Sequence, residues 1–233
     1  MIIERPADAR GRGGADWLAS RHTFSFASYY DPAWMGFGPL RVINDDRVAA
    51  GAGFPPHRHA NMEILSYVLE GALAHRDDSG GGGVIRAGEL QWMSAGHGIE
   101  HSEYNASDAE PVHFLQIWIQ PDRLNARPAY GQRVAAGDES RGRWALLASP
   151  DGADGSLAIR QDARMYLARL DAGAGVGQPL DPQRRYWLQV VRGAVEAAGR
   201  KLAAGDAIGL AEESGTLQLT ATEASEVLLF DLP

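Results

Sequence analysis

Glycine and proline interrupt this chain at short intervals, and that spacing limits the possible folds more than any other feature of the sequence. The 233 residues include 28 glycines and 12 prolines, which end regular elements and form turns. We expect a helix only near residues 121–125. Many short strands at this spacing predict an all-β sandwich or barrel rather than a helical bundle. The expected strands are β-branched or alternating segments at residues 40–43, 63–69, 84–85, 90–93, 112–119, 144–148, 157–160, 165–170, 186–191, 216–220 and 226–230.

The chain also contains an internal repeat. The segment Ser66–Ala74 aligns with Leu188–Glu196, which places Gly71 and Gly193 at the same position of the repeat. A glycine turn of the same type follows each copy. Two copies of one β-unit are the simplest explanation. We therefore predict two domains, residues 1–125 and 144–233, joined by a polar, proline-bounded linker over residues 126–143.

Composition excludes several classes of protein. The net charge of −8 and the single lysine, Lys201, argue against binding to a nucleic-acid backbone. No apolar run is long enough to span a membrane, and Glu4 stands where a signal peptide needs its apolar core, so we expect a cytoplasmic location. The chain has no cysteine, which excludes thiolate metal sites and cysteine nucleophiles. Histidines and carboxylates are therefore its only good metal ligands.

All seven histidines lie between residues 22 and 113, so only the first half of the chain can hold a histidine metal site. One residue separates His57 from His59, and one residue separates His101 from Glu103. On a strand this spacing points both side chains of a pair to the same face. If the two strands are neighbours, three imidazoles and one carboxylate converge, and such a set suits a divalent transition metal.

The alternative is that these side chains lie on the surface, because a lone His-x-His on a strand is more often exposed than a ligand. The second pair of residues favours the metal site. We expect His75 and His113 to be structural and His97 to lie in a loop, whereas the sequence leaves His22 undecided.

Four segments resemble the pirin branch of the cupin family. They are FSFASYYDP at 24–32, GFGPLRVINDD at 36–46, PPHRH at 55–59 and LQWMSAGHGI at 90–99. The first cupin motif is matched from Gly51 to Glu63, whereas Ser94-Ala95-Gly96 departs from the Pro-x-Gly of ordinary cupins. The resemblance is specific over residues 17–120, and beyond residue 145 it rests on chain length and the internal repeat.

The resemblance implies an all-β bicupin of two stacked antiparallel β-barrels, the first holding iron and the second degenerate and without metal. In ordinary cupins the glutamate of the first motif is a ligand, and here that residue is Glu63. We favour Glu103 because it shares a strand face with His101. By similarity to pirins, the metal ligands are then His57, His59, His101 and Glu103.

Counting from the aligned glycines gives the equivalent positions in the second half. The positions of His57 and His59 fall near residues 179–181, and those of His101 and Glu103 fall at Gln218 and Thr220. None of these residues is a histidine, in agreement with a second barrel that has lost its metal.

Bacterial pirin-like proteins are known as quercetin 2,3-dioxygenases. The resemblance therefore implies an enzyme that opens the heterocyclic ring of flavonols with dioxygen and releases carbon monoxide. Glu103 would serve both as metal ligand and as the base that takes the substrate's hydroxyl proton. One divalent ion is expected, Fe(II) first, with Zn, Ni, Co, Mn or Cu as substitutes, because His and Glu ligands accept all of these metals.

Two other classes of function remain open. Pirins are also described as iron-dependent regulators, and an acidic chain in that role would bind a protein partner, either a transcription factor or a metabolic enzyme. The other class is a cupin isomerase or small-ligand binding module, which would turn over without oxygen. For the enzyme we expect a small aromatic substrate and dioxygen, with neither nucleic-acid nor membrane binding.

Overall fold

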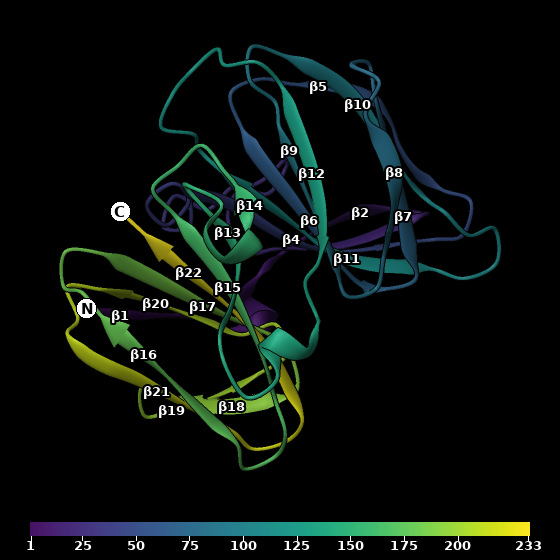
Figure 1. Ribbon diagram of the computed structural model, residues 1–233. Coiled ribbons are helices and arrows are strands. Elements are labelled where there is room, and N and C mark those ends of the chain that lie inside the picture. Colours follow the sequence, from purple (N-terminus) through teal and green to yellow (C-terminus); the bar gives the residue numbers. More distant parts are fainter. The chain divides into compact units, whose positions relative to one another are not determined.

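The computed structural model describes residues 1–233, and strands form most of the regular structure (Figure 1). It divides into two compact units. The N-terminal barrel comprises Gly11–Val134 and Ile159–Gln161, and the C-terminal barrel comprises Met1–Arg10, Ala135–Ala158 and Asp162–Pro233. Each unit holds one seven-stranded sheet and one four-stranded sheet. The predicted all-β fold with two similar halves is confirmed.

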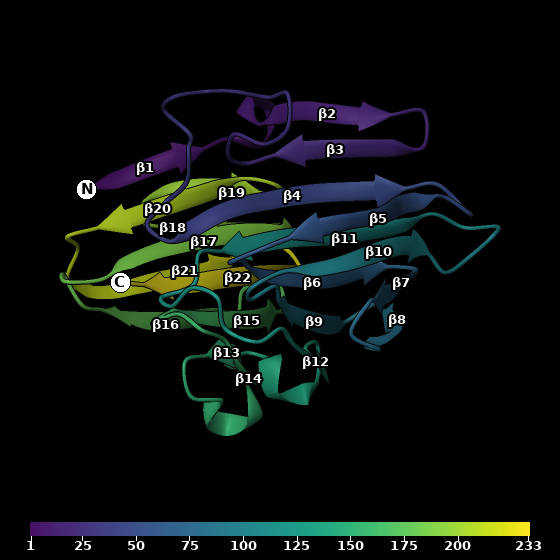
Figure 2. The same ribbon diagram turned by 90° about the horizontal axis from the view of Figure 1, so that it is seen from above.

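In the N-terminal barrel the large sheet has the strand order β12-β9-β6-β11-β4-β3-β2, and the small sheet has the order β5-β10-β7-β8. Strands β2 and β3 form a hairpin at the edge of the large sheet (Figure 2). The strands of this barrel are β2 (Gly11–Ala15), β3 (Leu18–His22), β4 (Leu40–Val48), β5 (Gly53–His59), β6 (Glu63–Glu70), β7 (Ala72–Asp77), β8 (Gly82–Arg86), β9 (Glu89–Ser94), β10 (Ile99–Asn105), β11 (Val112–Ile119) and β12 (Ala129–Val134).

Two apolar clusters and a polar row make up the interior of the N-terminal barrel. Along β6, Ser66 lies between Ile64 of one apolar cluster and Val68 of the other. Ser66 is in register with Gln116 on β11, which is in register with Asn44 on β4, and all three side chains are buried. Buried polar groups cost free energy unless they are hydrogen-bonded, so this row indicates that the middle of the barrel serves a purpose other than packing.

The C-terminal barrel has sheets of strand order β1-β20-β17-β22-β15-β13-β14 and β16-β21-β18-β19. One apolar cluster fills its interior and includes Leu188, Leu217, Leu219 and Leu229. The strands are β1 (Ile2–Arg5), β13 (Ala145–Ser149), β14 (Leu157–Ala158), β15 (Arg164–Leu170), β16 (Gly175–Leu180), β17 (Arg185–Arg192), β18 (Ala194–Ala197), β19 (Arg200–Ala203), β20 (Ala207–Ala211), β21 (Gly215–Ala221) and β22 (Ser225–Leu232). Three short 3₁₀ turns complete the chain, at η1 (Ala7–Ala9), η2 (Asp138–Ser140) and η3 (Ala153–Gly155).

The predicted domain boundaries differ from the structure at both ends of the first domain. Strand β1 pairs with β20, so residues 1–10 belong to the C-terminal barrel. Strand β12 pairs with β9 at the edge of the large sheet, although it lies within the predicted linker, residues 126–143. Both are partly exposed edge strands without a long apolar run, so the sequence carries only a weak signal for them.

The predicted helix near residues 121–125 is wrong, because this segment forms bends. Asn125 has a left-handed backbone with a φ of 57°, which ends any helical turn there.

The hydrogen-bond registers identify the equivalent positions of the two barrels. Glu103 is in register with His75 on β7, and the corresponding pair on β21 and β18 is Leu219 with Ala197. By the same comparison, His101 corresponds to Leu217, and His57 and His59 correspond to Gln178 and Leu180.

The equivalents predicted by counting, at 179–181, Gln218 and Thr220, are therefore one residue too far along the chain. The cause on the second strand is a loop: four residues, 95–98, join β9 to β10, whereas three residues, 212–214, join β20 to β21. A shift of one residue moves a side chain to the opposite face of a strand. Gln218 and Thr220 are accordingly exposed, whereas Leu217 and Leu219 are buried.

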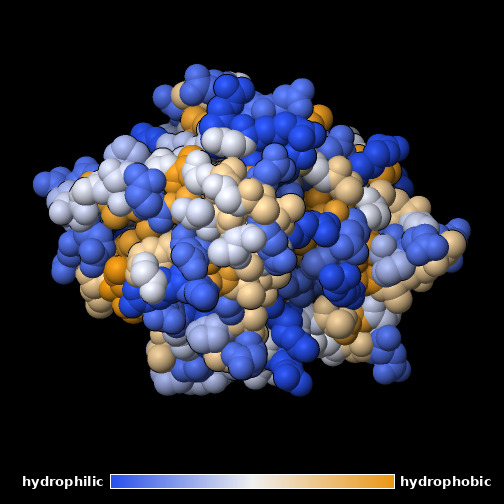
Figure 3. Space-filling model, turned by 90° about the horizontal axis from the view of Figure 1, so that it is seen from below, coloured by the Kyte–Doolittle hydropathy of each residue, from blue (hydrophilic) through white to orange (hydrophobic).

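No helix in the structure has both the length and the apolar character that crossing a membrane requires. The face of the molecule seen in Figure 3 is largely hydrophilic, with hydrophobic residues in scattered patches.

Candidate metal centre

Two neighbouring strands of the small sheet carry the predicted histidines. His57 on β5 is in register with His101 on β10. A bulge in β5, between Phe54 and His57, contains Pro55 and Pro56. Proline has no backbone N–H to give to a neighbouring strand, and it is therefore tolerated at such a bulge. Beyond the bulge, His57 and His59 follow at the spacing of two residues that places both on one face.

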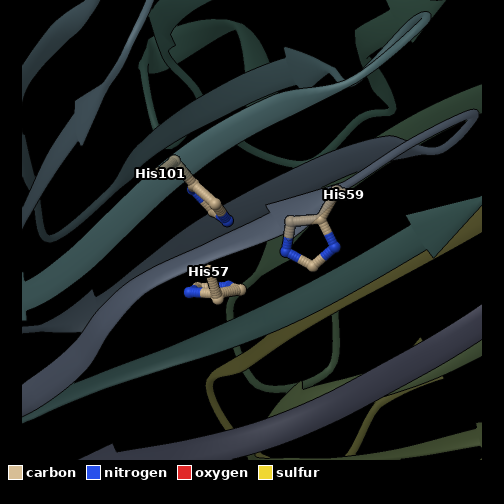
Figure 4. Close-up of side chains that lie close together, drawn as sticks. All are labelled: His57, His59 and His101. Carbon is tan, nitrogen blue, oxygen red and sulfur yellow. The ribbon is translucent and has the colours of Figure 1, made fainter.

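The three imidazoles lie against one another (Figure 4). The distances between ring centroids are 4.7 Å for His57 and His59, 4.4 Å for His57 and His101, and 4.8 Å for His59 and His101. One nitrogen from each ring belongs to a set of three atoms that all lie within 4.8 Å of one another. The sequence-predicted convergence of these histidines is therefore present in the fold.

Two histidines of this cluster, His59 and His101, are held in the neutral form that binds metals. Burial, with the neighbouring His57, lowers the pKa of His59 to about 4. Burial is also the main reason why the pKa of His101 lies far below its ordinary value, and the neighbouring histidines lower it further. The Nδ1 atom of His57 donates a hydrogen bond to the carbonyl oxygen of Pro55 at 2.8 Å, which leaves Nε2 as the nitrogen that can face a metal. Neutral imidazoles with free lone pairs are good ligands.

His101 provides the strongest test of whether a metal fits. Its side chain is buried, and neither ring nitrogen has a hydrogen-bond partner in the protein. A buried polar group without a partner costs about 1–3 kcal/mol, which a metal–nitrogen bond would remove. The donor set, three imidazoles and no thiolate, suits a divalent transition metal.

Glu103 lies on the same strand face as His101 and is also buried. Its carboxylate accepts hydrogen bonds from the Ser66 hydroxyl at 3.1 Å and from the Gln116 amide at 2.8 Å. Burial raises the pKa of Glu103, and these two hydrogen bonds partly offset that rise. The carboxylate is not within the 4.8 Å group of the three histidines, although it lines the same cavity as His57 and His59.

Glu63, the glutamate of the ordinary cupin motif, has a different environment. It is buried at the start of β6, where its carboxylate accepts hydrogen bonds from the Trp92 indole at 2.8 Å and from the Ser94 hydroxyl. The backbone N–H of Arg160 donates a third, at 3.1 Å. These three donors account for a structural role, and Glu63 does not line the cavity beside the histidines.

A cavity of about 440 Å³ opens beside His57 and His59, within the usual size range of small-molecule pockets. Its walls are of two kinds. Phe26, Phe54 and Trp118 form aromatic surfaces, and the ring of Trp118 packs against that of His59 with centroids 4.9 Å apart. The polar lining consists of Asn44, Asp46, Glu103 and Gln116, and Pro55 and Pro56 complete the cavity.

The remaining histidines lie outside the cluster. His113 is buried and its Nε2 lies 2.6 Å from Asp45, His97 is exposed, and the Nδ1 of His22 lies 2.8 Å from the side-chain oxygen of Asn44. His75 is closer to the centre than its prediction as a structural residue implies. Its ring centroid is 5.2 Å from that of His101, and it stacks on Tyr130.

The sequence reasoning missed the polar residues of the cavity wall. A signal for two of them exists in the strand Leu40–Val48, where Asn44 and Asp46 alternate with Ile43 and Asp45 and so share one face. Ser66 and Gln116 each have apolar neighbours on both sides in their strands, and nothing nearby in the sequence points to their partner, Glu103.

Comparison with known proteins finds relatives along the whole chain. The family model described as Pirin matches residues 5–119, and the one described as quercetinase C-terminal cupin domain matches residues 146–232. The chain is 47% identical over 233 residues to the quercetin 2,3-dioxygenase of Escherichia coli (strain K12), covering 100% of this chain and 99% of that protein. It is 42% identical to the pirin-like protein of Caulobacter vibrioides, with 99% of each covered.

A solved structure of the bacterial pirin YhhW from Escherichia coli, in complex with nickel(II), is also similar. It has 47% sequence identity and a TM-score of 0.94, and the match covers 100% of this chain and 99% of that chain. The similarity extends over both barrels, beyond the segments that carry the resemblance in the sequence. On these matches, the chain belongs to the pirin family.

Proposed function

We propose that this protein is a metal-dependent dioxygenase that opens the heterocyclic ring of flavonols such as quercetin, consumes dioxygen and releases carbon monoxide. The observation that carries the proposal is the cluster of three histidines, two of them with lowered pKa values, at one wall of an aromatic cavity. The names of relatives at 47% identity over the whole chain support the same activity.

One divalent ion, Fe(II), would be held by His57, His59, His101 and Glu103. The nickel complex of a relative at 47% identity supports a single divalent site, and the nitrogen and oxygen donors accept iron as well as nickel. When bound, the ion would supply Lewis-acid and redox chemistry for the reaction of the flavonol's 3-hydroxyl region with dioxygen.

The aromatic walls bind and orient the substrate. Phe26 and Trp118 meet edge to face at 5.3 Å between centroids, and with Phe54 they offer flat apolar surface to a planar ring system. Packing the rings between these side chains keeps water away from the reacting carbon atoms.

Glu103 takes the proton from the hydroxyl group of the substrate. Burial raises the pKa of its carboxyl group, so it holds a proton more readily than an exposed glutamate would. Proton transfer to a positioned base is worth roughly 10²–10⁴-fold in rate. The hydrogen bonds from Ser66 and Gln116 hold the carboxylate in place on the cavity wall. We prefer Glu103 to Glu63 because three donors already occupy the carboxylate of Glu63.

The test is anaerobic reconstitution with Fe(II), and separately with Ni(II), followed by an oxygen electrode and carbon monoxide detection with quercetin. We expect equal consumption of dioxygen and quercetin, with one carbon monoxide released per turnover. Chelator-treated protein is the matched control and should consume neither. Protein that binds one metal per chain but leaves quercetin and dioxygen unconsumed with either ion would contradict the proposal and support the regulatory class.

A further inference from the structure

Asp46 is a buried carboxyl group that the proposed chemistry leaves without a role. It lies on β4 with only 4% of its surface exposed, and it lines the same cavity as His57 and Glu103. Its Oδ1 atom is buried and has no hydrogen-bond partner in the protein. An acceptor without a donor is costly, and such groups are usually satisfied by a ligand or by water.

Side chains of the neighbouring strand β3 form a hydrogen-bonded group with Asp46. The hydroxyl of Ser20 hydrogen-bonds the Asp46 carboxyl group and lies 3.4 Å from the Nδ1 of His22. The same nitrogen of His22 lies 2.8 Å from Oδ1 of Asn44, the other β4 residue on this wall. The connected polar groups fix both β4 side chains, so the free oxygen of Asp46 has a defined position.

The charges around Asp46 indicate the kind of ligand that fits. No lysine or arginine lines the cavity, while Glu103 contributes a second carboxyl group. Burial, together with the nearby Asp45 and Glu103, raises the pKa of Asp46 to about 7. No lysine or arginine is available to pair with an anionic group of a ligand here, whereas a ligand with hydroxyl groups would supply the missing donor.

We infer that Asp46 is a substrate-binding residue whose carboxyl oxygen accepts a hydrogen bond from a phenolic hydroxyl that does not take part in the reaction. The ligand class is therefore a neutral, polyhydroxylated aromatic compound, and Asp46 selects it over analogues without the extra hydroxyls. The inference deepens the proposed function, and it rests on that proposal only for the identity of the reacting ring.

The test compares two flavonols, quercetin and 3-hydroxyflavone, which share the reacting hydroxyl and differ in all other ring hydroxyls. Binding to metal-free protein is followed by quenching of tryptophan fluorescence, since Trp118 lines the cavity. We expect the wild type to bind quercetin more tightly than 3-hydroxyflavone, and Asp46→Val to reduce that preference roughly tenfold or more, by losing a hydrogen bond to quercetin alone.

Two further variants make the result decisive. Asp46→Asn keeps the shape and one acceptor oxygen, so it should fold normally and recover part of the preference. Asp45→Asn removes the same charge from the next residue, whose side chain bonds His113 instead of lining the cavity, and it should leave the preference unchanged. An unchanged preference in Asp46→Val, an equal loss for both flavonols, or no binding by the wild type would overturn the inference.

The steady-state readout separates this inference from the proposed function. With metal-loaded protein, Asp46→Val should raise KM for quercetin and leave KM for 3-hydroxyflavone unchanged, relative to wild type. If the loaded wild type consumes neither flavonol while the binding preference still depends on Asp46, the proposed reaction fails and the assignment of Asp46 stands.

Discussion

The two barrels have the same arrangement of strands and differ in the side chains that fill their interiors. Each small sheet has the same connectivity, β5-β10-β7-β8 in the N-terminal barrel and β16-β21-β18-β19 in the C-terminal barrel. The interior positions held by His101 and Glu103 in one barrel are held by Leu217 and Leu219 in the other. The C-terminal barrel thus packs an uninterrupted apolar interior where the N-terminal barrel places a polar row.

The fold therefore does not require the histidine and carboxylate residues of the candidate centre. An apolar interior is the cheaper way to fill such a barrel, because every buried polar atom needs a partner. The N-terminal barrel contains unpartnered nitrogens on His101 and His75 and an unpartnered oxygen on Asp46, all close to the candidate centre. The C-terminal barrel has such atoms as well, on Gln189 and Trp144, but no group of histidines lies beside them. Polar groups without partners cluster at functional sites, where a ligand or metal satisfies them.

The largest expected effect comes from giving the N-terminal barrel a residue of the other barrel. His101→Leu copies Leu217 and should abolish stoichiometric metal binding and flavonol turnover, because it removes one of three converging ligands. The metal-free variant should be more stable than metal-free wild type by about 1–2 kcal/mol, since an unpartnered buried imidazole is replaced by an apolar side chain. Elemental analysis and thermal unfolding after chelation measure the two effects.

His113→Leu is the matched control for this change. It removes another buried histidine, but one that bonds Asp45 instead of facing the cavity. It should keep the metal and lose stability. Retention of one metal per chain by His101→Leu would show that the other ligands suffice without it.

The sequence predicts which side chains of one strand share a face, but not which positions of the two barrels are equivalent. The spacing of two residues correctly placed His57 with His59, and His101 with Glu103, on one strand face. Side chains alternate between the two faces within a strand, so this prediction needs no knowledge of the loops. Equivalence between barrels does need that knowledge. The loop after β20 is one residue shorter than the loop after β9, and counting through it selected the exposed Gln218 instead of the buried Leu217.

Contacts between strands far apart in the sequence were beyond prediction for a different reason. Ser66, Gln116 and Glu103 meet across the interior although 50 residues separate the first two. Each of them alone is an ordinary polar residue of a strand, and only the packing of the two sheets makes them one hydrogen-bonded group.

The next largest effect separates the two candidate glutamates. Glu103→Gln should lower turnover more than 100-fold and weaken metal binding, because it removes the base and an anionic ligand together, beyond the tenfold to hundredfold loss usual for residues behind the ligands. Glu63→Gln should keep the metal and lose about 1–3 kcal/mol of stability, since its three donors lose a charged acceptor. An unchanged cobalt spectrum for Glu103→Gln beside an altered one for Glu63→Gln would assign the ligand to Glu63.

A smaller effect should be common to both barrels, because it concerns a glycine turn that both contain. Gly71 and Gly193 have φ angles of 74° and 73°, and an added Cβ would lie 2.7 Å from the carbonyl oxygen of Pro111 and 2.3 Å from that of Ala224. Alanine at either position should cost about 1–3 kcal/mol in urea unfolding.

Gly199 provides the control, since it has the same φ of 73° as Gly193 but no atom within 4 Å of an added Cβ. Gly199→Ala should cost about 1 kcal/mol, from backbone strain alone. Equal costs at all three glycines would mean that the close approach of the neighbouring strand contributes nothing.

The last prediction concerns the pH dependence of the metal-free protein, where the histidines of one barrel have no counterpart in the other. The pKa of His59 is about 4 in the folded protein and about 6.5 when unfolded. Between these values the unfolded state binds the additional proton, so metal-free protein should lose stability as the pH falls from 6.5 towards 4. Above pH 6.5 both states are neutral at this position and the contribution disappears.

His59→Leu, which copies Leu180, should therefore lose less stability than wild type as the pH falls from 6.5 towards 4. The raised pKa values of Asp46 and Glu103 act in the opposite direction, but these groups are present in both proteins and contribute little to the difference. Thermal unfolding of chelated protein at several pH values measures the two profiles, and parallel curves would contradict the lowered pKa of His59.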